Sequence, residues 1–194
     1  HIGLPDLAGF GRRVMAISAE ETAAITIVQL GSLDAMARRY GLTPVHVKPH
    51  GALYHMLEQD VELATAFTEA VKSVAPQLRV TGLAGGQLCR IAQAAGLAVN
   101  PEAFCDRGYA ANGQLLARGT PGAVLDLPAT VEQALHIVQH QRVIDPNGNR
   151  LPIQADTLCL HGDRPDAALF ARSLHHALCK AGIRLQPPGN STSP

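Results

Sequence analysis

Short apolar runs and longer amphipathic stretches take turns along this chain, a pattern that predicts alternating strands and helices. The three clearest apolar runs are each followed within two residues by glycine or proline, which are frequent where a strand ends. We predict strands at residues 45–48, 79–83, 97–99, 103–105, 157–160 and 183–185, and residues 157–160 give the clearest pattern of a buried strand.

Capping signals and helical spacing place helices between these strands. Ser18 and Glu21 form a capping box, and Gly41 suits the residue after the helix end. A second capping box, at residues 130–133, predicts another helix start. The predicted helices span residues 18–40, 60–74, 87–95, 130–140 and 165–181. The apolar face expected for the first helix consists of Ile25, Val28, Leu33, Met36 and Ala37.

Strands that alternate with helices and lack a clear hairpin predict a parallel sheet with helical crossovers, and therefore an α/β fold. We expect one domain over residues 1–186 and a disordered tail at 187–194. Residues 106–125 read as a long polar loop, and residues 142–151 as a small excursion around a turn at 145–148. In such folds, functional residues gather at the carboxyl ends of the strands.

Composition narrows the class of protein. The 194 residues are 46% apolar and carry 16 basic and 16 acidic side chains, so the formal net charge is zero. A neutral chain does not favour nucleic acid or an anionic membrane as a partner, and no apolar run is long enough to span a bilayer. We expect a cytoplasmic globular enzyme. Its widely spaced cysteines are predicted to be buried thiols: Cys89, Cys105, Cys159 and Cys179.

Ionisable residues follow three of the predicted strands. Lys48 and His50 come at the end of the first, Asp106-Arg107 follows residues 103–105, and His161 follows residues 157–160, with Asp163 two positions on. Because parallel strands end at one edge of a sheet, we predict that these residues line one pocket. Pro49 and Gly51 around His50 indicate a fixed backbone with a close approach.

Each candidate also has a structural interpretation. His46 is expected to be a hydrogen-bonded core histidine. Lys48 can pair with Asp106 or Asp163, and Arg107 can either hold a substrate carboxylate or pin the long loop. Asp163 can be the N-cap of the last helix.

Two further patterns are weaker. His136 and His140 have zinc-ligand spacing, but they lack the glutamate of a zincin motif and are expected at the surface, as are His175-His176. The glycine-rich turn at residues 82–86 can hold an anion on its backbone N–H groups, although it lacks the residues of a nucleotide-binding fingerprint. A tight turn explains it equally well.

Several of these segments together resemble the LamB/YcsF family. The matching segments occur in family order and reach to about residue 185: Pro5-Asp6, Gly9–Arg13, His46–Tyr54, Gly82–Gly85, Asp106–Tyr109 and Cys159–Asp163. The family's acidic first strand and a later G-F-H-x-G-D segment have no counterpart here. At about 30 residues per β/α unit, we expect roughly two units to be missing before His1.

The resemblance implies an incomplete seven-stranded β/α barrel of the glycoside hydrolase/deacetylase type. It also implies a hydrolase that opens a cyclic amide, with ATP-dependent conversion of 5-oxo-L-proline (pyroglutamate) to L-glutamate. This reaction is expected to need 5-oxoprolinase subunits B and C as partners. A divalent metal is left open.

Given this chemistry, we assign roles to the candidates. The catalytic set is Lys48, His50, Asp106 and His161: a histidine for proton transfer, Lys48 for a developing oxyanion or phosphate, and Asp106 to orient a cationic group. The substrate-binding set is His1, Arg107, Tyr109 and Asp163.

Two other functions compete with this interpretation. One is a metal-dependent amide or carbohydrate deacetylase-like hydrolase that does not use ATP, with His1, His50 and His161 as candidate ligands. The other is a non-catalytic protein that only binds metabolites or partners.

Overall fold

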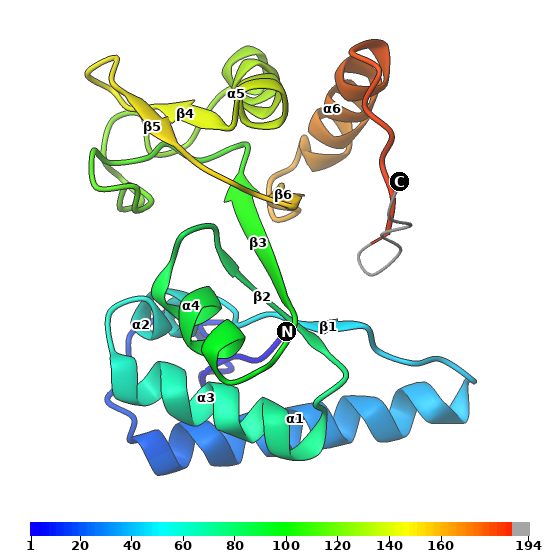
Figure 1. The fold of residues 1–194 in the computed structure, drawn as a ribbon. Helices are drawn as coiled ribbons and strands as arrows, with labels where there is room; N and C mark the ends of the chain where they lie inside the picture. The colour runs from blue at the N-terminus through cyan, green and yellow to red at the C-terminus, as the bar shows by residue number, and fades with distance from the viewer. Residues whose placement is uncertain (188–194) are drawn as a thin grey trace. The chain divides into compact units, whose positions relative to one another are not determined.

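The fold is that of a computed structural model, in which residues 1–187 are described (Figure 1). Within these residues, the chain forms two compact units, His1–Pro101 and Glu102–Pro187, and each is described by itself. The tail predicted at 187–194 lies outside the described residues apart from Pro187. The single domain expected over residues 1–186 stays a prediction.

The first unit alternates helices and parallel strands, as predicted. Its elements are α1 (Ala19–Arg39), β1 (His46–Val47), α2 (Ala52–Leu57), α3 (Val61–Val74), β2 (Arg79–Leu83), α4 (Gln87–Ala94) and the first half of β3 (Val99–Phe104). β1 pairs in parallel with β2, with His46 opposite Arg79. Ile2 extends this pairing through a parallel bridge to Pro49.

Local signals explain why most of these helices begin where they do. The predicted capping box of α1 is present: Glu21 N–H donates to Ser18 Oγ over 3.1 Å, and Ser18 N–H donates to Glu21 Oε2 over 2.8 Å. Asp60 caps α3 as a simple N-cap, because its carboxylate accepts the backbone N–H groups of Glu62 and Leu63. The short helix α2 was not predicted, because its start depends on the unusual backbone of Gly51.

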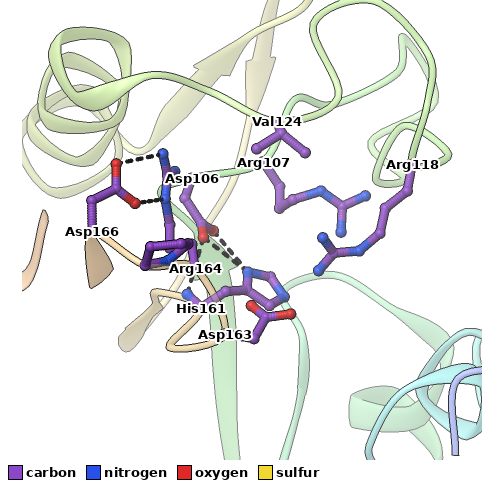
Figure 2. A pocket seen from close by; sticks show the side chains of 9 residues that line it. Asp106, Arg107, Arg118, Val124, His161, Asp163, Arg164 and Asp166 are labelled. Carbon is purple, nitrogen blue, oxygen red and sulfur yellow. Dashed lines mark hydrogen bonds and ion pairs between the residues drawn. The ribbon is translucent and has the colours of Figure 1, made fainter. Parts of the chain in front are cut away.

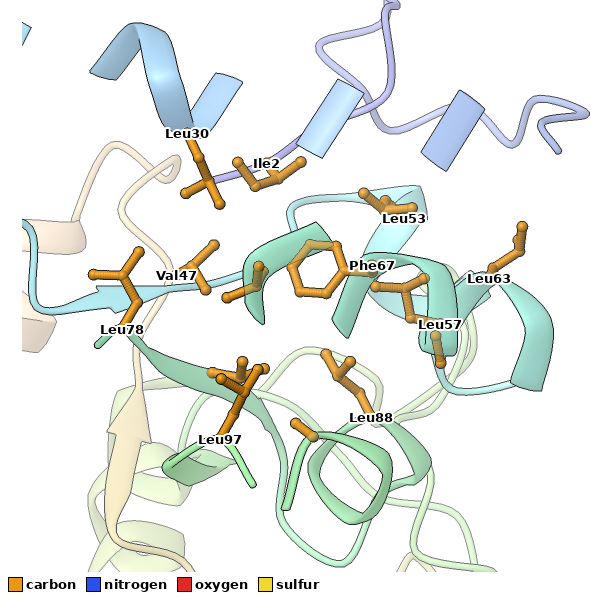
Figure 3. Close-up of a cluster of buried hydrophobic side chains, with 14 of the residues drawn as sticks. Ile2, Leu30, Val47, Leu53, Leu57, Leu63, Phe67, Leu78, Leu88 and Leu97 are labelled. Carbon is orange, nitrogen blue, oxygen red and sulfur yellow. The ribbon is translucent and has the colours of Figure 1, made fainter. Parts of the chain in front are cut away.

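The core of the first unit is a cluster of apolar side chains from its helices and strands (Figure 3). Phe67 of α3 lies at its centre and is fully buried, as are Leu57 of α2, Val80 of β2 and Leu88 of α4. Side chains from the ends of the unit, Ile2 and Leu97, also belong to the cluster, so the sequence-distant segments are held by one core.

The apolar face predicted for α1 is mostly wrong: Ile25 is partly buried and packs against the core, but most of the other predicted residues are exposed. Its buried residues are Thr22, Thr26 and Leu30, whereas Val28 and Met36 are 64% and 65% exposed. The two threonines can be buried because each hydroxyl donates to the carbonyl one turn earlier, Thr22 to Ser18 and Thr26 to Thr22. Both threonines are buried in a helix that packs against α3.

The second unit contains the end of β3 with α5 (Leu127–His140), β4 (Arg142–Ile144), β5 (Arg150–Pro152), β6 (Thr157–Cys159) and α6 (Ala167–Lys180). β3 and β6 pair in parallel, with Phe104 opposite Cys159. Hydrogen-bonded strands follow the order β1-β2-β3-β6, and the chain is α/β with parallel strands. The two short strands predicted at 97–99 and 103–105 are one strand, β3.

Three other predictions for this unit need correction. The excursion at 142–151 contains an antiparallel hairpin, β4–β5, because the Asp145 carboxylate accepts N–H groups across the turn from Asn147 and Asn149. Residues 183–185 do not form a strand. β6 is half-buried instead of buried.

The four cysteines differ in burial. Cys89 and Cys105 are buried, as predicted, whereas Cys159 is partly exposed and Cys179 lies exposed on α6. An apolar neighbour in sequence therefore did not guarantee burial on an outer helix face. Among residues 1–187, no helix has both the length and the apolar character needed to cross a bilayer.

Candidate functional site

A cavity of about 500 Å³ opens in the second unit, within the size range of small-molecule sites (Figure 2). It lies beyond the carboxyl ends of β3 and β6, where the sequence predicted a site. Its lining is mostly charged and consists of Asp106, Arg107, Arg118, Val124, His161, Asp163, Arg164, Pro165 and Asp166.

Asp106 and His161 form the central pair of this cavity. The His161 ring nitrogen Nδ1 lies 3.0 and 2.9 Å from the two carboxylate oxygens, and the His161 backbone N–H donates to Oδ2 over 3.0 Å. The carboxylate is nearly buried and the imidazole side chain is 24% exposed. β3 supplies one partner and β6 the other, so parallel pairing of these strands brings together residues 55 positions apart.

Hydrogen bonds from His161 favour the ionised form of Asp106. Burial alone raises the pKa of Asp106, but the hydrogen bonds from the His161 ring and backbone outweigh it and lower that pKa below its usual value. An ionised carboxylate accepts a hydrogen bond from Nδ1–H, which assigns this tautomer and leaves Nε2 as the basic nitrogen. The Phe104 ring stacks on the imidazole with centroids 5.7 Å apart.

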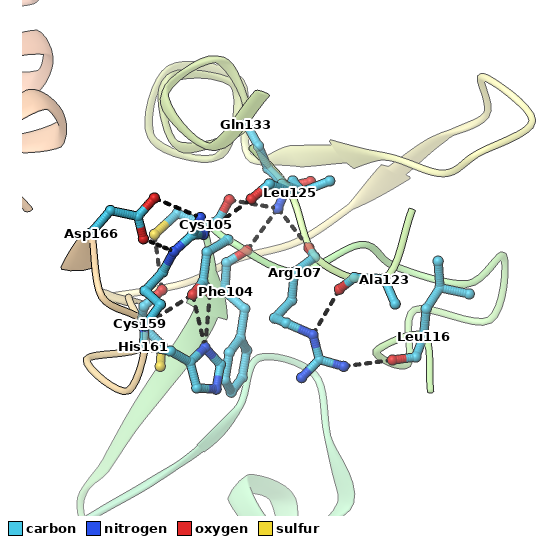
Figure 4. Close-up of polar contacts among 12 residues, drawn as sticks. Phe104, Cys105, Arg107, Leu116, Ala123, Leu125, Gln133, Cys159, His161 and Asp166 are labelled. Carbon is cyan, nitrogen blue, oxygen red and sulfur yellow. Dashed lines mark hydrogen bonds and ion pairs between the residues drawn. The ribbon is translucent and has the colours of Figure 1, made fainter. Parts of the chain in front are cut away.

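Gln133 of α5 holds the backbone from which Asp106 projects (Figure 4). Its Nε2 donates to the carbonyl oxygens of Phe104, Cys105 and Arg107 over 2.8, 3.2 and 2.8 Å. Gln133 does not form the predicted capping box, because α5 begins at Leu127, three residues before the predicted start, and is capped by Asp126. Pro128 in the first turn was the signal for the earlier start.

Arg107 combines the two roles left open for it. Its Nε donates to the Ala123 carbonyl over 2.8 Å and its Nη2 to the Leu116 carbonyl over 2.6 Å, so it pins the long loop. It also lines the cavity, although it is only 3% exposed. Burial, followed by the nearby charge of Arg118, lowers the pKa of this guanidinium.

Tyr109 lies beneath the site and does not line the cavity. Its ring is fully buried, and its hydroxyl oxygen accepts the backbone N–H of Phe104 over 2.7 Å. Burial raises the pKa of this phenol, which stays neutral. The structure therefore places Tyr109 as a support for the end of β3.

Sequence reasoning missed Arg118, Arg164 and Asp166. Arg164 pairs with Asp166 at 2.5 Å and packs over the Phe170 ring at 3.6 Å, so this pair secures the start of α6. Asp166, and not Asp163, occupies the N-cap position of α6. Arg118 lies on the long polar loop, where no periodicity marks one residue as functional.

The other predicted site residues lie in the first unit. His50 Nε2 lies 3.0 Å from the Phe10 carbonyl oxygen, the His1 ring is 6.0 Å from the His50 ring, and Lys48 Nζ lies 5.7 Å from the Tyr54 ring centroid. These residues and the Asp106–His161 pair belong to different units, so the pocket predicted to unite them stays a prediction.

The backbone around His50 is as constrained as the sequence indicated. Gly51 has a φ of +61°, and a Cβ there would lie 2.5 Å from the Gly11 carbonyl oxygen. The N–H of Ala52 donates to that oxygen over 2.9 Å. His46 is exposed and not a core histidine, because Val47 and Pro49 take the buried face of this segment.

The glycine-rich turn at 82–86 already holds an anion, the side chain of Glu58. Gln87 N–H at the start of α4 donates to Glu58 Oε2 over 2.5 Å. Burial raises the pKa of Glu58, and the backbone N–H donors partly offset this. This helix N-terminus is therefore occupied by the protein's own carboxylate.

Histidine pairs elsewhere show no sign of a site. His136 is partly exposed and His140 exposed, with ring centroids 5.8 Å apart, and His175-His176 is exposed on α6, as predicted. In the part of the chain from 1 to 187, no three His, Cys, Asp or Glu side chains form a metal-binding group. Metal binding by His1, His50 or His161 stays a prediction.

Comparison with known proteins gives consistent results. The model of the LamB/YcsF family matches residues 1–193. The chain is 45% identical over 189 residues to the 5-oxoprolinase A subunit of Geobacillus kaustophilus, covering 97% of this chain and 74% of that protein. It is 46% identical over 187 residues to the 5-oxoprolinase A subunit of Bordetella pertussis, covering 96% and 74%.

A solved structure is also similar. The crystal structure of a lactam utilization protein from Thermus thermophilus matches with a TM-score of 0.89 and 42% sequence identity. The match covers 96% of this chain and 74% of that one.

Proposed function

Because the chain belongs to the LamB/YcsF family, we propose that it acts as the A subunit of a 5-oxoprolinase and opens the cyclic amide of 5-oxo-L-proline to L-glutamate. Relatives that carry this name are 45–46% identical over nearly the whole chain. The observation that carries the proposal is the Asp106–His161 pair, whose basic Nε2 belongs to a small-molecule cavity at the strand ends.

The pair suits proton transfer during hydrolysis of an amide. Water adds its oxygen to the lactam carbonyl carbon while His161 Nε2 takes a proton from it. The ring C–N bond then breaks, and the imidazolium returns the proton to the departing nitrogen. Asp106 holds the tautomer and stabilises the imidazolium, and Arg107 provides positive charge in the same cavity.

The remaining parts of the proposal rest on the family resemblance. An unstrained lactam resists opening, so we propose that ATP transfers its γ-phosphoryl group to the lactam oxygen and leaves as ADP. This transfer would activate the carbonyl carbon toward water, and the phosphoryl group would leave as inorganic phosphate, with subunits B and C as partners in the cytoplasm. The glycine-rich turn does not suit the phosphates of ATP, because Glu58 occupies it. We further propose that the parallel strands belong to a seven-stranded β/α barrel of a single domain, and that Lys48 and His50 take part in the reaction.

The test is a reconstituted assay of the full chain with subunits B and C. We expect glutamate release and ADP formation that depend on 5-oxoproline and on this chain. Replacing Asp106 with Asn or His161 with Ala should lower kcat by about 10²- to 10⁴-fold, the usual contribution of a positioned acid–base group. His176→Ala, on the exposed face of α6, is the matched control and should keep full activity.

Two results would overturn the proposal. One is the absence of turnover in every combination of subunits. The other is ATP-independent hydrolysis with tightly bound zinc, which would favour a metal-dependent deacetylase-like hydrolase. Unchanged turnover in the Asp106→Asn and His161→Ala variants would instead identify a non-catalytic protein within the complex.

A further inference from the structure

Three arginines line the cavity that contains His161, and one of them, Arg164, is paired with Asp166. Arg107 and Arg118 both reach the cavity, and Figure 2 shows their guanidinium groups facing the same space. Arg107 is buried and Arg118 is exposed, and burial, followed by the repulsion from Arg118, lowers the pKa of the Arg107 guanidinium. The placement of both groups therefore needs a chemical reason.

Arg107 has donors and charge left over after its structural contacts. A guanidinium has five N–H donors, and the hydrogen bonds found for Arg107 in residues 1–187 go to two backbone carbonyls. Carbonyl oxygens accept hydrogen bonds but do not neutralise a full charge. Asp106 is the nearby carboxylate, and its oxygens accept hydrogen bonds from His161.

Hydrogen bonds from Arg107 hold the loop that carries Arg118 at the cavity. The two carbonyls that Arg107 holds belong to Leu116 and Ala123, one on each side of Arg118 in the loop. The loop is also closed at its base, where Gly108 N–H donates to the Ala123 carbonyl and Leu116 N–H donates to the Gly108 carbonyl. Arg107 thus fixes the segment that presents the second guanidinium.

We propose that Arg107 and Arg118 together form a binding site for the carboxylate of the cyclic-amide substrate, with Arg118 as a specificity-determining residue. The inference rests on the proposed function, since 5-oxoproline carries a carboxylate next to its ring nitrogen. Planar guanidinium groups bind carboxylates through paired hydrogen bonds, which fixes the direction of the ligand as well as holding it. The arrangement selects lactams that carry this group over lactams that lack it.

Kinetics of the assembled complex test the role of Arg118. Arg118→Ala should raise the KM for 5-oxoproline by about 10- to 100-fold, the range set by loss of a charged hydrogen bond, with a smaller change in kcat. Arg118→Lys should restore part of the loss, because it keeps the charge without the fork. Arg172→Ala, exposed on α6, is the matched control and should change neither constant.

A neutral analogue separates recognition of the carboxylate from general damage to the site. The lactam 2-pyrrolidinone, which lacks the carboxylate, should inhibit the wild type weakly and inhibit Arg118→Ala equally. An unchanged KM for 5-oxoproline in Arg118→Ala would overturn the proposal. A raised KM for ATP, or loss of inhibition by inorganic phosphate with 5-oxoproline unaffected, would assign the two arginines to a phosphate and also overturn it.

Binding measured without turnover distinguishes this inference from the proposed function. Calorimetry of 5-oxoproline with the assembled complex in the absence of ATP should show binding that Arg118→Ala weakens. Such binding without any turnover would contradict the proposed reaction while supporting the carboxylate site. Binding that is equal in wild type and Arg118→Ala would contradict the carboxylate site while leaving the reaction standing.

Discussion

The carboxylate of Asp106 has both a structural role and a chemical role. It accepts the backbone N–H of His161, which ties the end of β6 to the end of β3, and it accepts Nδ1–H of the same residue, which sets the tautomer. The contact between the two strand ends and the tautomer of His161 therefore both depend on this one ionised carboxylate. Protonation of Asp106 should weaken both at once.

This coupling predicts how acid acts on stability. The pKa of Asp106 is lowered in the folded protein from its ordinary value of 3.8, so its contribution to the free energy of unfolding is present above that pH and is lost as pH falls through the folded pKa. Asp106→Asn should be less stable than wild type at pH 7, and the difference should shrink below pH 3.8.

Urea denaturation of both proteins between about pH 7 and pH 3 measures this difference. A gap between wild type and Asp106→Asn that stays constant over the acid range would mean that the carboxylate is not held in its ionised form by His161.

At the scale of elements, the N-terminus of helix α4 depends on a carboxylate that follows another helix. Its N-terminus lacks a capping side chain of its own, since Gly86 occupies the N-cap position. Glu58, the residue after α2, supplies the acceptor instead, so one carboxylate joins two helices. This contact requires that residue 86 have no side chain, because a Cβ there would overlap the Glu58 carboxylate.

Gly86→Ala should therefore destabilise the protein by about 1–2 kcal/mol, the usual cost of losing a helix cap. The Gly86 backbone has a φ of −74°, so the loss would come from displacing Glu58 and not from backbone strain. Gly31→Ala is the matched control: a Cβ there meets open space on α1, and the variant should be as stable as wild type or more so.

A double-mutant cycle completes this measurement. In a Glu58→Ala background, Gly86→Ala should cost almost nothing, because the side chain it displaces is gone. An equal cost in both backgrounds would rule out the contact as the cause.

The elements that sequence predicted well are those with local signals. Asp60 begins α3 and the capping box begins α1, and both are short-range hydrogen bonds that can be read from a few residues. The start of α5 was misplaced because Gln133 fits a capping box yet bonds to carbonyls 26–29 residues away. Such long-range contacts leave no local pattern.

In the candidate site, too, residues with a local signal were predicted and residues placed by long-range contacts were missed. Asp106, Arg107 and His161 were predicted because each directly follows an apolar strand, and the fold places strand ends together. Arg118 was missed because its position depends on how Arg107 folds the loop. Glu58 was missed because the turn it fills looks like an anion site in sequence alone.

At the scale of the whole molecule, charge balance governs behaviour in solution. The chain carries 16 basic and 16 acidic side chains, and its isoelectric point is about 7.3. Proteins near zero net charge associate and precipitate more readily. Exposed apolar residues on α1, including Val28 and Met36, add to this tendency.

We therefore expect solubility of the isolated chain to be lowest near pH 7.3 and to rise on either side. Precipitation in polyethylene glycol at a series of pH values measures this directly. A minimum displaced by more than about one pH unit would indicate that apolar association, and not charge, sets the limit.

The closed base of the loop after Arg107 has a consequence for how this protein can change. The backbones of Gly108 and Gly122 approach so closely that a Cβ on Gly108 would overlap the Gly122 carbonyl oxygen. The residues between these two glycines form a loop whose ends are held together by backbone contacts. Tyr109, the first residue after Gly108, supports the end of β3 and has to be kept. We expect that residues 110–121 can be exchanged in length and sequence while Asp106 and His161 stay in place, so new lactam specificities can be sought by grafting residues 110–121.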